Sequence, residues 1–373
     1  MQKYRVIILV LLVVAIVVAI GLLEKSRVGS GGEERGGLIQ RMNDMNAKEK
    51  SVKYPAAREL AGIAGYINSE PFKLEDQIGK KVILLDIWTY SCINCQRTLP
   101  YLNSWQEKYA EAGLLIVGVH TPEFEFEKKL ENVQRAVEQY GINYPVVLDN
   151  DYATWHSYNN RYWPRKFLID IDGYVVYDHI GEGGYQETER KIQELLAERA
   201  DRLGIEADVA MEVSNFDTGA PTAGGNSPEI YFGASRNSYL GNGKDGKVGE
   251  QVFTEPEGLK THILYLAGRW QFASEYAENL EAGTKIIYRY VGQRVFFVAQ
   301  ADKPTKALIL RDGEPIAKEL AGADIQYDAQ GDSYIEVSES RLYKLIEQGA
   351  QEEHTLEIIP QTPGLQAFTF TFG

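Results

Sequence analysis

The chain has very little cysteine. Its 373 residues include only Cys92 and Cys95, three positions apart. A structural disulfide across so short a loop would restrain little of the unfolded chain. A zinc site would need two further ligands, yet there is no second C-x-x-C, and the five histidines show no H-x-H or H-x-x-x-H spacing. The pair therefore favours redox chemistry over a structural bridge or a metal site.

Positive charge is also scarce. The sequence has 39 Lys and Arg against 53 Asp and Glu, a net charge of -14. Binding to nucleic acid requires a basic face, and no basic cluster with interleaved aromatic residues is present, so nucleic acid is not expected as a partner. The 44% hydrophobic content is typical of globular cores, and the length suits two domains with additional segments.

One long apolar run lies near the N-terminus. Residues 6–23 carry no charge, and as a helix they would span about 27 Å, close to the thickness of a bilayer core. Lys3 and Arg5 precede the run, which predicts a cytoplasmic N-terminus. A cleaved signal peptide is the alternative, but the run is long for one and no A-x-A-like site follows it. We expect an uncleaved single-pass anchor (1–25), a linker or helical tether (26–55), and the remaining chain on the extracytoplasmic (periplasmic or cell-surface) side of the cytoplasmic membrane.

Strands and helices alternate over residues 56–210. Apolar runs predict strands at 81–88, 114–121 and 144–149 and a hairpin over 166–181 that turns at Asp172-Gly173. Helices are predicted at 96–113, 126–141 and 187–204, with weaker helical character over 38–66. This alternation indicates an α/β domain with a central mixed sheet flanked by helices.

The pattern changes after a linker of turn-forming residues (211–227). Residues 228–373 contain short strands separated by turns and almost no helix, which predicts an all-β jelly roll or β-sandwich. In the last strand, the period of two places Phe368, Phe370 and Phe372 on one face.

The position of Cys92 predicts its chemistry. It lies where a strand and a short loop give way to a helix, and a helix N-terminus stabilises a thiolate through its dipole and free N–H groups. Cys95 lies one helical turn further on and is expected to be more buried. We expect Cys92 to attack a substrate disulfide and Cys95 to resolve the mixed disulfide that forms.

Several stretches resemble the thioredoxin superfamily, within it the membrane-anchored TlpA/ResA branch, and most closely the extracytoplasmic part of the DipZ proteins of actinobacteria. The N-terminal match rests on Asp86-Ile87-Trp88, WTYSCINC (88–95), GVHTPEFEFEK (118–128) and YNNRYWPRKFLID (158–170). The C-terminal match rests on PEIYFGASR (228–236), LAGRW (266–270) and FTFTFG (368–373), which resemble a domain similar to carbohydrate-binding modules. DipZ proteins begin with a multi-helix membrane domain, whereas this chain has one hydrophobic segment.

The resemblance implies a thioredoxin fold and roles for particular residues. Asp86 would be buried and relay a proton to Cys95, Pro164 would be a cis-proline that faces the substrate backbone, and Pro100 would kink the helix. The active-site rim would comprise Trp88, Thr89, Tyr90, Ser91, Ile93, Asn94 and Trp163, although core packing is favoured for Trp88. Glu123 and Glu125 lie in a nearby loop, for which a solvated acidic turn is favoured over a place at the site.

The predicted function is that of a membrane-anchored thiol–disulfide oxidoreductase, acting reductively in cytochrome c maturation or disulfide repair by analogy with the TlpA/ResA branch. Expected partners are proteins with disulfides or dithiols and a separate membrane electron carrier similar to CcdA or DsbD. No cofactor and no metal ion are expected. Three roles stay open for the C-terminal domain: binding of a cell-surface glycan, docking of a protein partner, or passive scaffolding. Glycan binding would use exposed aromatic residues, for which the candidates are Tyr231, Tyr239, Trp270, Tyr276 and Tyr288, although core packing is favoured for aromatic residues in such domains.

Two other functions stay open. A thiol peroxidase of the peroxiredoxin type carries P-x-x-x-T-x-x-C, of which Thr89-x-x-Cys92 matches half, with Leu85 in the proline position. The third reading is a non-catalytic anchored protein that binds a glycan or a protein partner on a thioredoxin scaffold.

Overall fold

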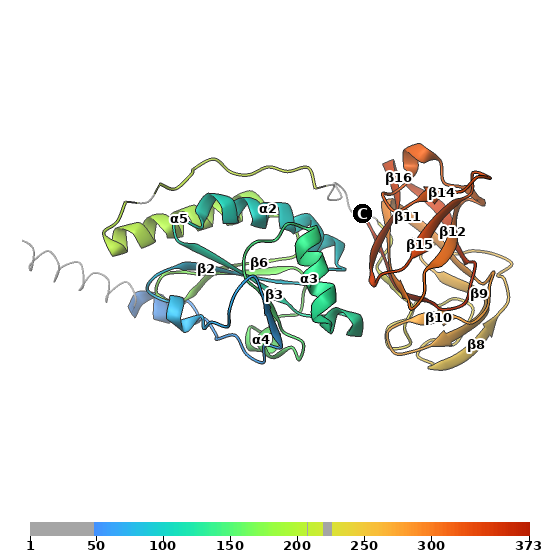
Figure 1. Cartoon of the computed structure of the whole chain (residues 1–373), viewed down its shortest axis with the longest axis horizontal. Coiled ribbons are helices and arrows are strands. Elements are labelled where there is room, and N and C mark those ends of the chain that lie inside the picture. The colour runs from blue at the N-terminus through green and yellow to red at the C-terminus, as the bar shows by residue number, and fades with distance from the viewer. Residues whose placement is uncertain (1–47, 207, 219–225) are drawn as a thin grey trace, which may run out of the picture.

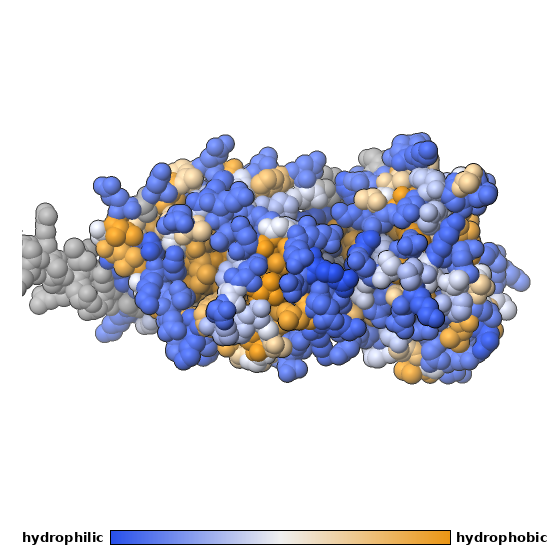
Figure 2. All heavy atoms as spheres, viewed as in Figure 1, coloured by the Kyte–Doolittle hydropathy of each residue, from blue (hydrophilic) through white to orange (hydrophobic). Residues whose placement is uncertain are grey.

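The computed structural model describes residues 48–206, 208–218 and 226–373, which form two domains side by side (Figure 1). The predicted anchor and most of the tether lie outside the described residues. Within the described ranges, no helix is long and apolar enough to cross a membrane. The face drawn in Figure 2 is mostly hydrophilic, with hydrophobic residues in separate patches.

The N-terminal domain is built on a six-stranded mixed sheet. Its strand order is β1-β4-β3-β2-β5-β6. β2, β3 and β4 are parallel, and the other pairings are antiparallel. The strands are β1 (Gly65–Ile67), β2 (Val82–Trp88), β3 (Leu114–His120), β4 (Val146–Leu148), β5 (Arg165–Ile169) and β6 (Val175–Ile180).

Helices cover both faces of this sheet, so β2 is buried along its whole length. Leu84 and Trp88 belong to a core shared with α2 (Ile93–Tyr109), α3 (Leu130–Gln139) and α5 (Tyr185–Leu203). The alternate residues Ile83, Leu85 and Ile87 pack in a second core with Trp155 of α4 (Ala153–Ser157). The predicted α/β domain with its central mixed sheet is therefore confirmed.

The short elements differ from the sequence-based expectation. β1 and α4 were not predicted, because three or five residues carry too little periodicity to be recognised. Two 3-10 turns, η1 (Glu75–Gln77) and η2 (Glu125–Lys128), occupy expected loop or helix positions. Helical character over 38–66 is wrong for its later part, since only 48–53 is helical among the residues described there and 65–67 form a strand.

The C-terminal domain is β-rich, as predicted, and its strands form one connected antiparallel sheet. Strand β11 pairs with both β9 and β17, while β10 joins β9 to β17. These four strands thus close a ring of pairings around a common core. The elements are β7 (Ile230–Tyr231), β8 (Gly249–Phe253), β9 (Leu264–Phe272), β10 (Ala277–Asn279), β11 (Lys285–Ala301), β12 (Thr305–Arg311), β13 (Glu314–Pro315), η3 (Lys318–Leu320), β14 (Gln326–Tyr327), β15 (Ser333–Val337), β16 (Arg341–Pro360) and β17 (Leu365–Phe372).

A β-bulge in β17 places Phe368 in the contact between the domains. Thr369 pairs with Val298, but the next partner pair is Ala367 with Ala299, so Phe368 is the extra residue. Phe370 and Phe372 face the core of their own domain, whereas the Phe368 ring lies 5.1 Å from that of Phe124 and 4.8 Å from that of Phe126. The prediction that all three phenylalanines share one face is therefore wrong for Phe368.

The segment that joins the domains lies along the N-terminal domain beside α2 and α5 (Figure 1). The hydroxyl of Tyr101 donates to the carbonyl of Phe216 at 3.0 Å. Lys108 donates to the carbonyl of Glu212 at 2.8 Å, and Gln193 donates to that of Ala210 at 3.0 Å. Residues 208–218 are thus fixed to both helices before the chain enters the second domain.

Candidate active site

Cys92 and Cys95 begin α2. Cys92 is the N-cap of the helix, and its Sγ accepts a hydrogen bond from the Cys95 backbone N–H at 3.4 Å. Both are free thiols; Cys92 is partly exposed and Cys95 is only 1% exposed. A substrate disulfide can therefore reach Cys92 but not Cys95. This geometry suits a nucleophile in front of a resolving thiol.

Burial raises the pKa of Cys95 well above its usual value, and its contact with Cys92 and the nearby charge of Asp86 raise it further. Asp86 lies in the middle of β2 and is 1% exposed. Burial raises the pKa of Asp86 to about 6, although the attraction of Lys166 opposes the shift. A carboxyl group that titrates near neutral pH can exchange a proton with a buried thiol. The relay role of Asp86 stays a prediction that these shifts support.

Lys166 is a site residue that sequence reasoning missed. It pairs with Asp86 across the antiparallel strands β5 and β2 and is fully buried. Burial lowers its pKa, while Asp86 and Cys95 oppose that change. Neither the Lys166 Nζ nor the Asp86 Oδ1 has a hydrogen-bond partner in the described part of the chain. The sequence feature that could have revealed it is a single lysine at the start of the apolar run KFLI, two residues after Pro164.

Glu127 is a second missed residue, and it holds the loop that carries Cys92. Its buried carboxylate accepts hydrogen bonds from the Ser91 hydroxyl at 2.6 Å and the Ser91 N–H at 3.3 Å. Its other oxygen accepts from the N–H groups of Glu123 and Phe124 at 2.6 and 3.0 Å. Burial raises the pKa of Glu127 to about 6, and the Ser91 hydrogen bond opposes this shift. One side chain thus connects the loop after β3 to the residue before Cys92.

Replacing Glu127 with alanine should destabilise the protein by about 2–4 kcal/mol, because buried donors on Ser91 and on the loop lose their acceptor. Chemical denaturation at pH 7.5 measures this, with Glu125→Ala as the control. The Glu125 side chain is 73% exposed and pairs only with Lys128 among the described residues, so its loss should cost less than about 0.5 kcal/mol. Equal stabilities for the two variants would contradict the role given to Glu127.

The residues at positions 88–90, before Cys92, are buried and do not line the surface in front of it. Trp88 and Thr89 are fully buried and Tyr90 is 4% exposed. The Tyr90 ring stacks on His120 at 5.7 Å, and its hydroxyl donates to the Ser340 carbonyl of the C-terminal domain at 3.0 Å. Burial lowers the pKa of His120 to about 3, so this imidazole is neutral. The predicted rim is therefore wrong for Thr89 and Tyr90, while the core packing favoured for Trp88 is confirmed.

The surface in front of Cys92 is a crevice of about 390 Å³ between the domains. Of the predicted rim residues, Ser91, Ile93, Asn94 and Trp163 line it. The C-terminal domain contributes the opposite wall, which sequence reasoning did not foresee. Its lining residues from that domain are Glu229, Tyr231, Arg236, Thr369 and Thr371.

Glu123 also lines this crevice, contrary to the expectation of a solvated turn. Its Oε1 lies 2.8 Å from the Arg236 Nη1 and accepts a hydrogen bond from the Tyr231 hydroxyl at 2.9 Å. Glu125 is exposed, as expected. The loop after β3 thus joins the two domains beside the cysteines.

The two predicted prolines occupy distinct positions. The Trp163–Pro164 peptide bond is cis, and Pro164 directly precedes β5, the neighbour of β2. Trp163 shares the crevice with Cys92. Pro100 lies inside α2, which continues on both sides of it. The roles of both prolines stay predictions.

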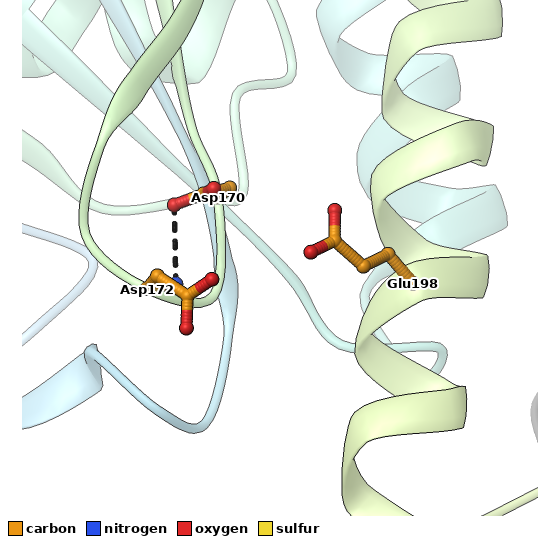
Figure 3. Close-up of side chains that lie close together, drawn as sticks. All are labelled: Asp170, Asp172 and Glu198. Carbon is orange, nitrogen blue, oxygen red and sulfur yellow. Dashed lines mark hydrogen bonds between the residues drawn. The ribbon is translucent and has the colours of Figure 1, made fainter. Parts of the chain in front are cut away.

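A group of carboxylates far along the chain from the cysteines holds a lysine. Glu198 of α5 faces Asp170 and Asp172 of the β5–β6 turn (Figure 3). The Lys50 Nζ lies 2.7 Å from Asp170, 3.1 Å from Asp172 and 2.5 Å from Glu198. Arg202 adds an ion pair with Asp172 at 2.6 Å, so two cations share the charge of the cluster, and Lys50 fixes the helical residues 48–53 to the domain.

The aromatic residues considered for glycan binding are mostly enclosed. Trp270 and Tyr288 are fully buried, so neither can form a binding platform. Tyr231 lies in the crevice, and Tyr276 packs on Phe368 at 5.3 Å. Tyr239 is 36% exposed. Glycan binding stays a prediction with Tyr239 as its exposed candidate.

Comparison with known proteins places this site in a family. Residues 55–196 match the redoxin family model, and residues 227–373 match the model of a thioredoxin-like C-terminal domain. The thiol–disulfide oxidoreductase ResA of Bacillus thuringiensis is 31% identical over 35% of this chain and 71% of its own length. The chain belongs to the thioredoxin-like thiol–disulfide oxidoreductases. The predicted resemblance and the predicted enzyme class are therefore confirmed.

One relative of this thioredoxin-like protein matches it across both domains. Protein DipZ of Mycobacterium tuberculosis is 33% identical over 94% of this chain, which spans about half of the DipZ length (49%). A solved thioredoxin-like protein in the oxidized form is 28% identical, with a TM-score of 0.36 over 39% of this chain and 97% of its own.

Proposed function

We propose that this protein is a membrane-anchored, extracytoplasmic thiol–disulfide oxidoreductase that reduces protein disulfides through Cys92 and Cys95. One observation carries the proposal: a partly exposed thiol at a helix N-terminus stands in front of a buried thiol whose pKa is raised. The accessible Cys92 attacks the substrate, and the protected Cys95 releases it. Asp86 and Lys166 beneath Cys95 supply groups that can take up its proton.

The location and the direction of the reaction rest on the sequence. The uncharged run 6–23 supports the anchor, and the reductive direction follows the resemblance of the active-site sequence to the TlpA/ResA branch. The enzyme would then receive electrons from a separate membrane carrier and would act on proteins with exposed disulfides, in cytochrome c maturation or disulfide repair.

The reduction potential of the Cys92–Cys95 pair tests the direction. The full-length chain in detergent is equilibrated with dithiothreitol or glutathione buffers, and the thiol fraction is measured after rapid alkylation. We expect a value near that of thioredoxin, about −270 mV. A value near that of DsbA, about −120 mV, would contradict the reductive role and indicate an oxidant.

A further inference from the structure

The crevice over Cys92 has the size of a site for a small molecule. Its volume is about 390 Å³, within the range of about 300–1,000 Å³ that is usual for ligand pockets. Thioredoxin-like residues form one wall, including Asn94, Arg161 and Trp163, and the C-terminal domain forms the other. A partly exposed Cys92 opens into this space, so whatever occupies it lies next to the nucleophile.

Two of the charged residues that line the crevice are already paired with each other. Glu123 and Arg236 form an ion pair at 2.8 Å. The Arg236 guanidinium also lies 3.6 Å above the centre of the Tyr231 ring, and the Tyr231 hydroxyl donates a hydrogen bond to Glu123. This group bridges the domains, and the Glu229 carboxyl group also interacts with Tyr231 and Arg236.

Arg161 and Glu229 are the remaining charges of the lining, one from each domain. Arg161 is exposed to solvent. Glu229 also keeps exposed surface, but the protein around it desolvates its carboxyl group. Within the described ranges neither has an ion-pair partner, and Glu229 accepts a hydrogen bond from the Thr371 hydroxyl at 3.2 Å. The crevice therefore brings the Arg161 cation and the Glu229 carboxyl group, neither of which has an ion-pair partner among the described residues, into the same space as the reactive thiol.

We propose that this crevice binds low-molecular-weight disulfides of the amino-acid type, which carry an ammonium and a carboxylate group close to their sulfur atoms. Arg161 pairs with the carboxylate and Glu229 with the ammonium group, and Cys92 meets the disulfide between them. The inference rests on the proposed function, since it names a substrate class for the same cysteines, and it assigns the C-terminal domain a part in selecting that substrate.

The reaction uses thiol–disulfide exchange alone. The Cys92 thiolate attacks one sulfur of the disulfide R–S–S–R, forms the Cys92–S–S–R bond and releases the first thiolate R–S⁻. Cys95 loses its proton to the solvent or to the Asp86–Lys166 pair and attacks the Cys92 sulfur, which releases the second R–S⁻. The small disulfide gains two electrons, which the Cys92–Cys95 dithiol loses on forming its disulfide.

A charge series of disulfides tests the inference. Reduced full-length protein is mixed with cystine, which carries both charges, with cystamine (ammonium only), with 3,3′-dithiodipropionate (carboxylate only), or with the neutral 2-hydroxyethyl disulfide. The reaction runs at pH 7.5, and the loss of protein thiols over time is measured by stopping samples with an alkylating reagent. Burial, with the charge of Glu123, raises the pKa of Glu229 to about 7, so most of this group is ionised at that pH. Comparing each variant with wild type on the same disulfide cancels intrinsic reactivity.

Each substitution should slow only the reactions of disulfides that carry the charge opposite to that of the replaced residue. Arg161→Gln should slow cystine and 3,3′-dithiodipropionate about fivefold, the upper range for a partly exposed ion pair. Glu229→Gln should slow cystine and cystamine to a similar extent. The other disulfides should react at wild-type rates with each variant. The matched controls Arg190→Gln and Glu111→Gln change the net charge equally outside the crevice and should leave all four rates unchanged.

The outcomes separate this inference from the proposed function. If 2-hydroxyethyl disulfide oxidises the wild-type protein but both variants show no preference by charge, the inference is wrong and the proposed function stands. If no disulfide oxidises the wild-type cysteines, the proposed function itself is wrong. Uniform slowing on all four disulfides would indicate a structural defect, and it would also contradict the assigned roles.

Discussion

Replacing Cys92 with serine should abolish disulfide reduction, while replacing Cys95 with serine should trap the enzyme on its substrate. Only Cys92 is exposed to an incoming disulfide, since Cys95 is 1% exposed. Without Cys92, turnover should fall by a factor on the order of 10³ or more, to the level of uncatalysed exchange. In Cys95→Ser the first bond still forms, but no thiol resolves it.

Insulin reduction measures the turnover, and non-reducing mass spectrometry detects the covalent adduct with a disulfide-bonded peptide. The double variant Cys92→Ser/Cys95→Ser is the control and should form no adduct. An adduct that accumulates in Cys92→Ser but not in Cys95→Ser would show that the two roles are reversed.

Replacing Asp86 with asparagine should stabilise the protein at neutral pH and slow the chemistry. The folded-state pKa of Asp86 is about 6, above the value of about 3.9 expected in the unfolded chain. The folded state therefore binds the proton more tightly, and the stability contributed by this group falls as pH rises through that window. A shift of about two units corresponds to about 3 kcal/mol above pH 6.

Urea denaturation between pH 3.5 and 8 measures this effect. Asp86→Asn should gain about 3 kcal/mol at pH 7.5 and almost nothing at pH 3.5, where Asp86 is protonated in both states. Asp151→Asn removes an exposed carboxylate and should show no such pH dependence. A gain that is constant with pH would show that folding does not shift the pKa of Asp86, and a loss at pH 7.5 would show that Lys166 stabilises its carboxylate more than burial destabilises it.

Local patterns were enough to predict where Cys92 and Asp86 lie in the fold. The apolar run of β2, the loop and the helix start follow one another within fifteen residues, so the position of Cys92 and the burial of Asp86 could be deduced from neighbouring sequence. Lys166 could not be assigned this way, because its contact with Asp86 depends on the register of two strands eighty residues apart in the chain.

The contact between the domains could not be predicted from the sequence either. The alternation of β17 predicted that Phe368 faces the same way as Phe370, but the bulge turns it towards Phe124 and Phe126. The loop that holds Phe124 also carries Glu123 and Glu127. The one extra residue of this bulge thus helps to place the acidic loop beside Cys92. Such a contact cannot be predicted from a periodic sequence pattern.

The central claim is that Cys92 and Cys95 interconvert between a dithiol and a disulfide. Intact mass measurement of the full-length chain, before and after treatment with a disulfide oxidant and again after dithiothreitol, tests it most directly. We expect a reversible loss of two hydrogens that peptide mapping assigns to a Cys92–Cys95 bond. Cysteines that remain thiols under every condition, or that form only bonds between chains, would contradict the account.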